Sequence, residues 1–190
     1  TKYSDGLSGI ILCGTSGNLA HLKEVSHELK ARIDQGDGEV VDDKYLRDLF
    51  GWMTERIENP NTPNDWIAGD PDIVADHAND PFNNFEATPN IRSLYYFVQM
   101  METINGTEWA EKIPKSIPFY NIAGDQDPVG LYGEGVYAVS NWLAETGHYV
   151  ETKLYSGYRH EIHNYRDIRD EVEQGIVDFI NRMIERKTSM

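Results

Sequence analysis

The sequence has 190 residues, of which 39% are hydrophobic and 26% are charged, a mixture typical of a folded globular domain. Its 32 acidic and 17 basic residues give a net charge of −15, which would repel a phosphate backbone, so we expect no nucleic-acid partner. The same charge disfavours adsorption to an anionic membrane, and the apolar runs are too short to span a bilayer, so we expect no stable membrane anchor.

The first residues, Thr1–Gly6, show neither a starting methionine nor the basic-then-apolar layout of a signal peptide. We therefore expect the sequence to start inside a longer parent chain. Cys13 is the only cysteine, so no internal disulfide can form and nothing requires an oxidising compartment. Together these features predict a cytoplasmic protein.

The first half of the chain predicts one buried strand followed by several helices. A short apolar run over residues 7–12 enters a glycine-rich turn, which is typical of a strand. The Pro- and Asn-rich residues 59–64 predict a turn, and residues 64–80 predict a short helix around Trp66 followed by a loop. Apolar residues at helical spacing predict three longer helices, over residues 18–34, 42–57 and 89–105.

The second half predicts an alternation of strand and helix. Residues 117–123 are apolar along their length, as expected for a strand of a parallel sheet. A helix over 132–147, a strand over 150–155 and a helix over 167–184 follow. Strands joined by helices imply an α/β fold with a parallel sheet. Because the stretch between the first two strands is too long for a simple crossover, we expect it to form a separate helical lid.

Two loops that follow predicted strands carry the side chains of acid–base chemistry. Gly124-Asp125-Gln126-Asp127 follows one strand, and Gly157-Tyr158-Arg159-His160 follows the next. Functional groups of open parallel sheets gather at the carboxyl ends of the strands, so these loops should meet. Acyl transfer by a serine needs a histidine base and a carboxylate that orients it. The two loops supply that pair from neighbouring positions.

A resemblance to the α/β-hydrolase fold is carried by three segments, IPFYNIAGDQDPVG, ETKLYSGYRHEIHN and the terminal DFINRMIE. They look like the C-terminal third of this fold. They are similar to the branch of the superfamily that holds lysophospholipases, monoacylglycerol lipases and serine aminopeptidases. LSGIILCGTSG resembles the strand that follows the nucleophile helix in these enzymes. The resemblance implies the C-terminal part of an α/β-hydrolase parallel sheet, with three strands and a helical cap insertion. It divides the chain into a core strand and turn (1–16), the cap (17–113) and the C-terminal core with the acid and histidine loops (114–190).

The resemblance also assigns roles to individual residues. The catalytic acid of such enzymes is the second aspartate of a G-D-x-D-P loop, which matches Asp127, and the base is the histidine of a G-x-R-H-E loop, which matches His160. Asp125 is interpreted as a turn or capping carboxylate, and His163 stays open as an alternative base. The other histidines have no partner positioned in the sequence, and we expect them on the surface or in the cap: His21, His27, His77 and His148.

No serine nucleophile can be assigned. A G-x-S-x-G elbow does not occur in the sequence, and Gly14-Thr15-Ser16-Gly17 is one residue short of it and follows the wrong strand. Because the serine precedes the acid in this fold, we expect it, with the oxyanion hole, in an N-terminal region of roughly 100 residues. Without that region the strand at 7–12 would be an open apolar edge. We therefore predict that the chain is stable only with this region or a complementary chain, and we leave a homodimer open.

The helix over residues 89–105 carries more large apolar side chains than one buried stripe needs. Such a surface can line a pocket for an acyl group, and ordinary packing of the cap is the alternative. The candidate pocket residues are Tyr95, Tyr96, Phe97, Met100 and Met101.

These observations predict a serine hydrolase that cleaves a carboxylic ester with an apolar acyl group, as a lysophospholipase or monoacylglycerol lipase does. Its substrate would be a small, lipid-like ester, and the reaction needs neither a metal nor an organic cofactor. This chain alone is expected to be inactive because the serine is missing. The alternatives are a non-catalytic, hydrolase-like binding module and another hydrolysis on the same fold, of a peptide, an epoxide or a halide.

Overall fold

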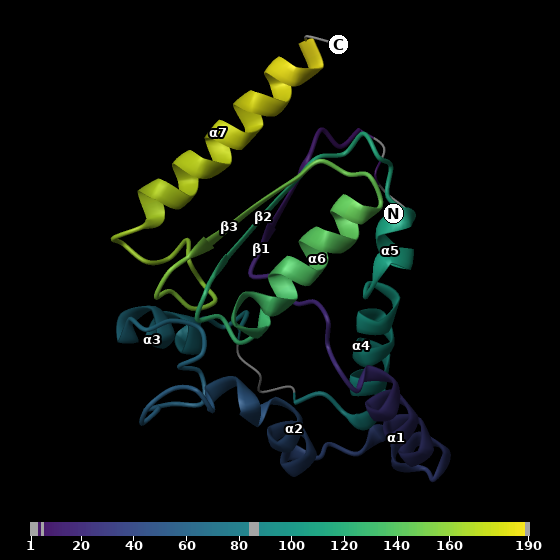
Figure 1. Ribbon diagram of the computed structural model, residues 1–190. Helices are drawn as coiled ribbons and strands as arrows, with labels where there is room; N and C mark the ends of the chain where they lie inside the picture. Colours follow the sequence, from purple (N-terminus) through teal and green to yellow (C-terminus); the bar gives the residue numbers. More distant parts are fainter. Residues whose placement is uncertain (1–3, 5, 84–87, 189–190) are drawn as a thin grey trace.

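A computed structural model describes residues 4, 6–83 and 88–188 of the chain. It contains a parallel sheet of three strands in the order β1-β2-β3, with β1 at Ile10–Cys13, β2 at Phe119–Gly124 and β3 at Val150–Tyr155. Ile10 lies opposite Phe119, which lies opposite Val150, so the three strands start level. The predicted α/β class and three-stranded parallel sheet are confirmed (Figure 1).

Seven α-helices accompany the sheet in the described part of the chain. Two of them follow the second and third strands, and Figure 1 shows α6 on one face of the sheet and α7 on the other. The remaining five lie between β1 and β2. Their bounds are α1 Leu22–Asp34, α2 Asp43–Phe50, α3 Pro71–Asn79, α4 Ile91–Thr103, α5 Thr107–Glu111, α6 Glu134–Glu145 and α7 Arg169–Thr188. None of these helices is both long and apolar enough to cross a membrane.

The central strand β2 is buried along its whole length because both faces of the sheet are covered there. Phe119 packs against α6 with Val139 and Leu143. Its neighbour Tyr120 points to the other face and stacks on Phe179 of α7, with ring centroids 5.3 Å apart. This alternation follows from the two-residue period of a strand. In contrast, β1 alternates between half-buried and exposed residues, and within the described residues it pairs with β2 alone.

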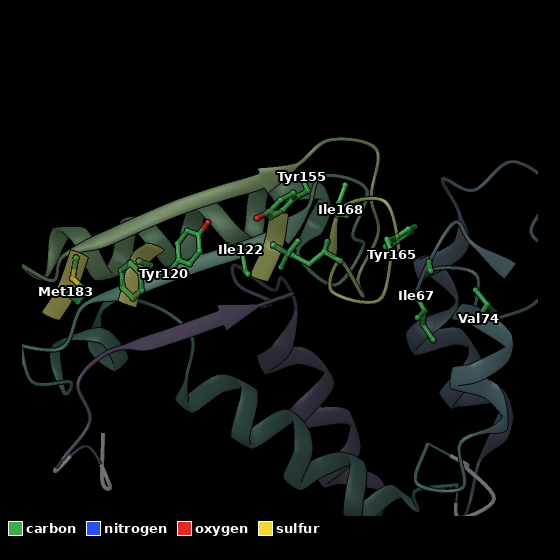
Figure 2. Packing of buried hydrophobic residues seen from close by; sticks show 12 residues of the cluster. Ile67, Val74, Tyr120, Ile122, Tyr155, Tyr165, Ile168 and Met183 are labelled. Carbon is green, nitrogen blue, oxygen red and sulfur yellow. The ribbon is translucent and has the colours of Figure 1, made fainter. Parts of the chain in front are cut away.

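The insertion between β1 and β2 contains two differently packed parts. Helices α1, α2 and α4, here called the outer helices, share a separate apolar cluster around Leu29, Leu94 and Val98. Residues 65–79, here called the inner segment, place Ile67 and Val74 in the same cluster as the sheet residues. Figure 2 shows these two side chains on the Tyr165 side of that cluster.

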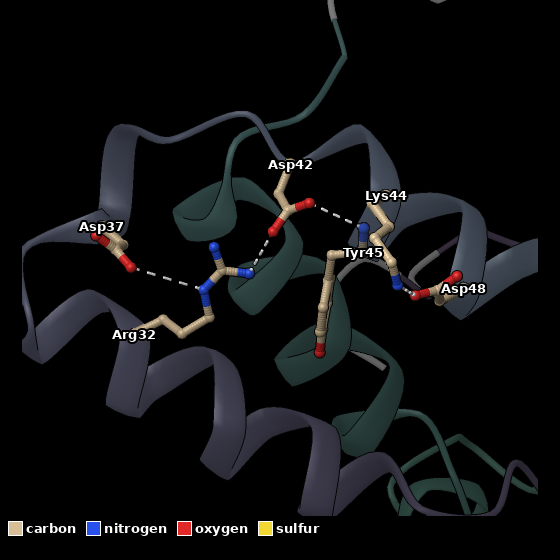
Figure 3. Close-up of polar contacts among 6 residues, drawn as sticks. All are labelled: Arg32, Asp37, Asp42, Lys44, Tyr45 and Asp48. Carbon is tan, nitrogen blue, oxygen red and sulfur yellow. Dashed lines mark hydrogen bonds and ion pairs between the residues drawn. The ribbon is translucent and has the colours of Figure 1, made fainter.

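Polar contacts stabilise the outer helices at their surface (Figure 3). Arg32 of α1 pairs with Asp42 at 2.9 Å and with Asp37 at 3.8 Å. Asp42 caps α2, since its carboxylate accepts a hydrogen bond from the backbone N–H of Tyr45 at 2.9 Å. That bond, followed by the bond from Arg32, lowers the pKa of Asp42.

The structure corrects the predicted helix around Trp66. Residues 62–67 form turns, and the helix comes later, as α3. Its start has a clear cause, because Asp70 accepts a hydrogen bond from the N–H of Asp72 at 2.9 Å and Pro71 occupies the first turn. The helix predicted over 18–34 also starts later, at Leu22, since residues before it, such as His21, have a positive φ.

Candidate active site

Asp127 lies in the turn that follows β2, at the carboxyl edge of the sheet, and its side chain is fully buried. Both carboxylate oxygens are used. Oδ1 accepts a hydrogen bond from the N–H of Val129 at 2.9 Å, and Oδ2 lies 3.0 Å from Nδ1 of His160. The backbone carbonyl of Asp127 also accepts a bond from the N–H of Tyr132 at 2.8 Å. The carboxylate is therefore held in one orientation.

His160 lies in the loop that follows β3, and its Nδ1 atom faces the carboxylate of Asp127. A carboxylate only accepts hydrogen bonds, so Nδ1 carries the proton and the lone pair is on Nε2. Within residues 4, 6–83 and 88–188 nothing hydrogen-bonds to Nε2, and the side chain is 27% exposed. The imidazole is thus oriented by a buried acid on one side and accessible on the other, which is the geometry of a general base.

Two glycines allow this close assembly. A Cβ on Gly14, at the end of β1, would lie 2.7 Å from Cε1 of His160, and its φ of +62° already favours glycine. A Cβ on Gly124, at the end of β2, would lie 2.0 Å from the carbonyl oxygen of Tyr158. The backbone at the ends of β1 and β2 therefore packs directly against the histidine loop, with no room for a side chain at either glycine.

Asp125 and His163, the other acid and histidine of these two loops, do not take part in the contact between Asp127 and His160. Asp125 accepts a hydrogen bond from the N–H of Gly157 at 2.7 Å, so it joins the acid loop to the histidine loop. Burial tends to raise the pKa of Asp125, but hydrogen bonds from Gly157 and Gln126 outweigh it and the pKa is lowered. His163 is exposed, and the bond to Asp127 is made by His160.

The inner segment reaches the histidine loop, which the sequence does not indicate. The ring of Trp66 lies against that of His160, with centroids 5.2 Å apart and planes at 52°. The residue after His160, Glu161, pairs with Nδ1 of His77 at 3.0 Å. His77 lies in α3 of the insertion, in keeping with the expected place in the cap, and its partner Glu161 is not indicated by the sequence. His148, expected on the surface or in the cap, is instead buried beside the end of α6, with Nδ1 3.1 Å from the carbonyl of Leu143 and Nε2 3.3 Å from that of Ile113.

An apolar cavity of about 300 Å³ lies between the outer helices and the acid loop. Its walls come from the loop after β1, from α1, α2 and α4, from the 3-10 turn Gly51–Thr54, and from the residues after Asp127. The lining residues are Ser16, Leu19, Ala20, Leu22, Val25, Leu49, Phe50, Trp52, Met53, Phe97, Val98, Met101, Val129 and Leu131.

Of the five candidate pocket residues, Phe97 and Met101 line this cavity. Tyr95 packs against the cluster of the outer helices. Tyr96 and Met100 are 62% and 50% exposed and lie outside the cavity lining. Periodicity identifies the apolar helix, but the face that borders the cavity depends on how that helix packs.

Neither a metal site nor a thiol nucleophile is indicated. Among the described residues, no group of three or more His, Cys, Asp and Glu side chains is arranged to hold a metal ion. Cys13 is exposed as a residue at the sheet edge, yet partial burial of its thiol and the nearby charge of Asp127 raise its pKa to about 11. The thiol is therefore protonated at neutral pH, and a protonated thiol is a poor nucleophile.

Known proteins resemble this chain over nearly its whole length. Residues 1–167 match a family described as "Serine aminopeptidase, S33". A thermostable carboxyl esterase from Bacillus coagulans, solved in complex with glycerol, is 71% identical with a TM-score of 0.90, and the match covers 95% of this chain and 58% of that one. This chain therefore spans 58% of the length of the esterase.

Two further solved structures are more distant. A lipase in its open form is 31% identical with a TM-score of 0.80, and the match covers 93% of this chain and 57% of that one. A monoacylglycerol lipase from Paleococcus ferrophilus is 13% identical with a TM-score of 0.57, covers 96% of this chain and 62% of that one, and shows a likeness of fold. Among curated proteins, none matches the chain in sequence.

Proposed function

Because the chain belongs to the serine aminopeptidase family of α/β-hydrolases, we propose that it supplies the acid and the base of a serine hydrolase that cleaves carboxylic esters with an apolar acyl group. The observation that carries this proposal is the 3.0 Å contact between Oδ2 of the buried Asp127 and Nδ1 of His160. An esterase 71% identical to the chain supports ester hydrolysis as the reaction.

The chemistry follows from the orientation of the imidazole. Nε2 of His160 takes the proton of a serine hydroxyl as that oxygen attacks the ester carbonyl, and then donates it to the leaving alcohol. Asp127 keeps the ring in the required tautomer and stabilises the cation that forms. The serine and the oxyanion hole belong, in this proposal, to an N-terminal region of the full-length protein.

The apolar cavity supports the proposal that the substrate carries an apolar acyl group. It lies beside the acid loop, which contributes Val129 and Leu131 to its wall, so an acyl chain in the cavity would be close to the acid–base pair. Each methylene buried there would contribute about 0.8 kcal/mol to binding, or roughly a fourfold increase in affinity.

The experiment measures ester hydrolysis by the full-length protein, meaning this chain with its N-terminal region. His160→Ala and Asp127→Asn should each lower kcat by about 10³- to 10⁴-fold, since they remove the base or its correct tautomer. The matched controls, His163→Ala and Asp125→Asn, should lower it far less. A protein that hydrolyses no ester, or whose Asp125→Asn variant is the more damaged, would contradict the proposal.

Two further measurements address the nucleophile and the acyl group. A fluorophosphonate should label a serine outside these 190 residues, and labelling within them would contradict the placement of the nucleophile. The kcat/KM for p-nitrophenyl esters should rise from acetyl to longer acyl groups, and Phe97→Ala should change this dependence. Tyr96→Ala, one residue along the same helix and outside the cavity lining, is the control. Faster cleavage of amino-acid p-nitroanilides would favour a peptidase instead.

A further inference from the structure

The residue before His160 joins the histidine loop to the insertion. Nη1 of Arg159 donates hydrogen bonds to the carbonyl oxygens of Asp65 and Ala68, at 2.6 and 2.9 Å. A guanidinium is charged at every accessible pH, and hydrogen bonds from a charged donor are roughly twice as strong as neutral ones. This one side chain therefore holds both ends of the turn 65–68 against the histidine loop.

The residue after His160 makes a second connection to the same turn. The backbone N–H of Glu161 donates to the carbonyl of Ile67 at 3.0 Å. The Glu161 carboxylate lies 3.0 Å from Nδ1 of His77 in α3, and it also accepts a bond from Nδ2 of Asn164 at 2.6 Å. His160 is thus flanked on both sides by residues that hydrogen-bond to the inner segment.

A buried tyrosine completes the connection. The hydroxyl of Tyr165 accepts a hydrogen bond from the N–H of Gly69 at 2.5 Å and lies 3.4 Å from the N–H of Arg159. Its ring packs edge-on against Tyr158, with centroids 4.8 Å apart. With the ring of Trp66 already against the imidazole, residues 65–69 contact the histidine loop at every position from Arg159 to Glu161.

We propose that Arg159 is a positioning residue, which places the imidazole of His160 by fixing the histidine loop to residues 65–69. The inference rests on the proposed function of His160 and extends it, because it makes part of the insertion a fixed support of the base. Arg159 does not touch the reacting atoms in this proposal. It acts through His160, whose ring is bounded by Asp127, by Trp66 and by the backbone of Gly14.

The expected effect is a loss of turnover with substrate binding retained. A displacement of a catalytic group by about 1 Å can lower the rate by about 10²-fold. Arg159→Met removes the charged donor and keeps a side chain of similar length, so kcat should fall by roughly 10- to 100-fold. KM should change by less than about threefold, because the acyl cavity is lined by other residues.

The experiment compares full-length variants of matched type. Arg159→Lys keeps the charge and one donating group, and it should restore part of the lost kcat. Arg166→Met removes an exposed arginine of the same loop region and should leave kcat unchanged. The downfield proton resonance of Nδ1 of His160, identified by its absence in His160→Ala, should broaden or move in Arg159→Met and stay in place in Arg166→Met.

The outcomes separate this inference from the proposed function. If His160→Ala is inactive but Arg159→Met keeps kcat within threefold of the parent, or raises KM alone, the positioning role is overturned and the hydrolase remains. If Arg159→Met does not melt cooperatively, the positioning role is tested with Tyr165→Phe instead. This variant removes only the hydroxyl that contacts Gly69 and Arg159 and keeps the buried ring. A lower kcat at constant KM and a shifted resonance in Tyr165→Phe support the inference, and an unchanged kcat overturns it.

Discussion

The two parts of the insertion between β1 and β2 are attached to the protein in different ways. The outer helices bury Leu29 and Val98 in a cluster of their own and border an open apolar cavity. The inner segment buries Ile67 and Val74 in the main core of the sheet and hydrogen-bonds to the loop of His160. One insertion in the sequence is therefore two structural units.

We expect this difference to separate the part of the insertion that moves from the part that stays fixed. Elements with a separate small core can open at low free-energy cost, whereas elements in the main core open only with global unfolding. We therefore expect substrate entry to involve motion of the outer helices around the cavity. The inner segment should stay fixed, because its displacement would also move the histidine loop.

The largest expected effect comes from deleting one apolar side chain in each part. Ile67 and Leu29 are both fully buried, so truncation of either to alanine should cost about 2–5 kcal/mol locally. Ile67→Ala should lower the global free energy of unfolding measured in urea. Leu29→Ala should instead speed amide hydrogen exchange in the outer helices, with little change in β2. Equal loss of protection in β2 for both variants would remove the distinction.

A smaller effect is expected at Asp65, which begins the inner segment. Its carboxylate accepts bonds from the N–H of Asn61 at 2.7 Å and the hydroxyl of Thr62 at 2.6 Å. Burial tends to raise the pKa of Asp65, but these bonds, with the charge of Arg159, outweigh it and lower the pKa. Asp65→Asn should therefore cost about 1–2 kcal/mol of stability at neutral pH.

The sign of the pH dependence follows from that lowered pKa. The contribution of Asp65 is fully present above its unfolded pKa of about 3.9, and it is lost as the pH falls through the lower folded value. The stability difference between the parent and Asp65→Asn, measured by urea unfolding, should therefore shrink below about pH 4. A difference that stays constant down to pH 2 would show that the charge of Asp65 is not involved.

The smallest effect is expected at the surface of the outer helices. Arg32 pairs with Asp42 and Asp37 where all three side chains are partly exposed (Figure 3), and exposed ion pairs contribute little. Arg32→Gln should leave the melting temperature almost unchanged and kcat unchanged. A marked fall in kcat would mean that the outer helices also support the acid–base pair.

The meeting of the two loops could be predicted from the sequence because each follows a strand whose pattern is local, while the choice of Asp127 and His160 within them rested on the family resemblance. The apolar run at 117–123 and the strand at 150–155 place Asp127 and His160 at the same sheet edge, and the structure brings them to 3.0 Å. Periodicity also identified α4 and α6, with ends that differ by a few residues. The short helix predicted around Trp66 lies later, as α3, where Asp70 and Pro71 form a typical start signal in the sequence.

The remaining features depend on contacts between residues that are distant along the chain. Glu161 and His77 are 84 residues apart, and nothing in their local sequence indicates that they pair. The choice of Phe97 and Met101 over Tyr96 and Met100 at the cavity depends on the rotation of α4 against its neighbours. The sequence by itself therefore determined the sheet and the two loops that meet at its edge, since strand patterns and turns are local. Only tertiary packing decided which part of the insertion supports His160, because burial depends on where the whole chain runs.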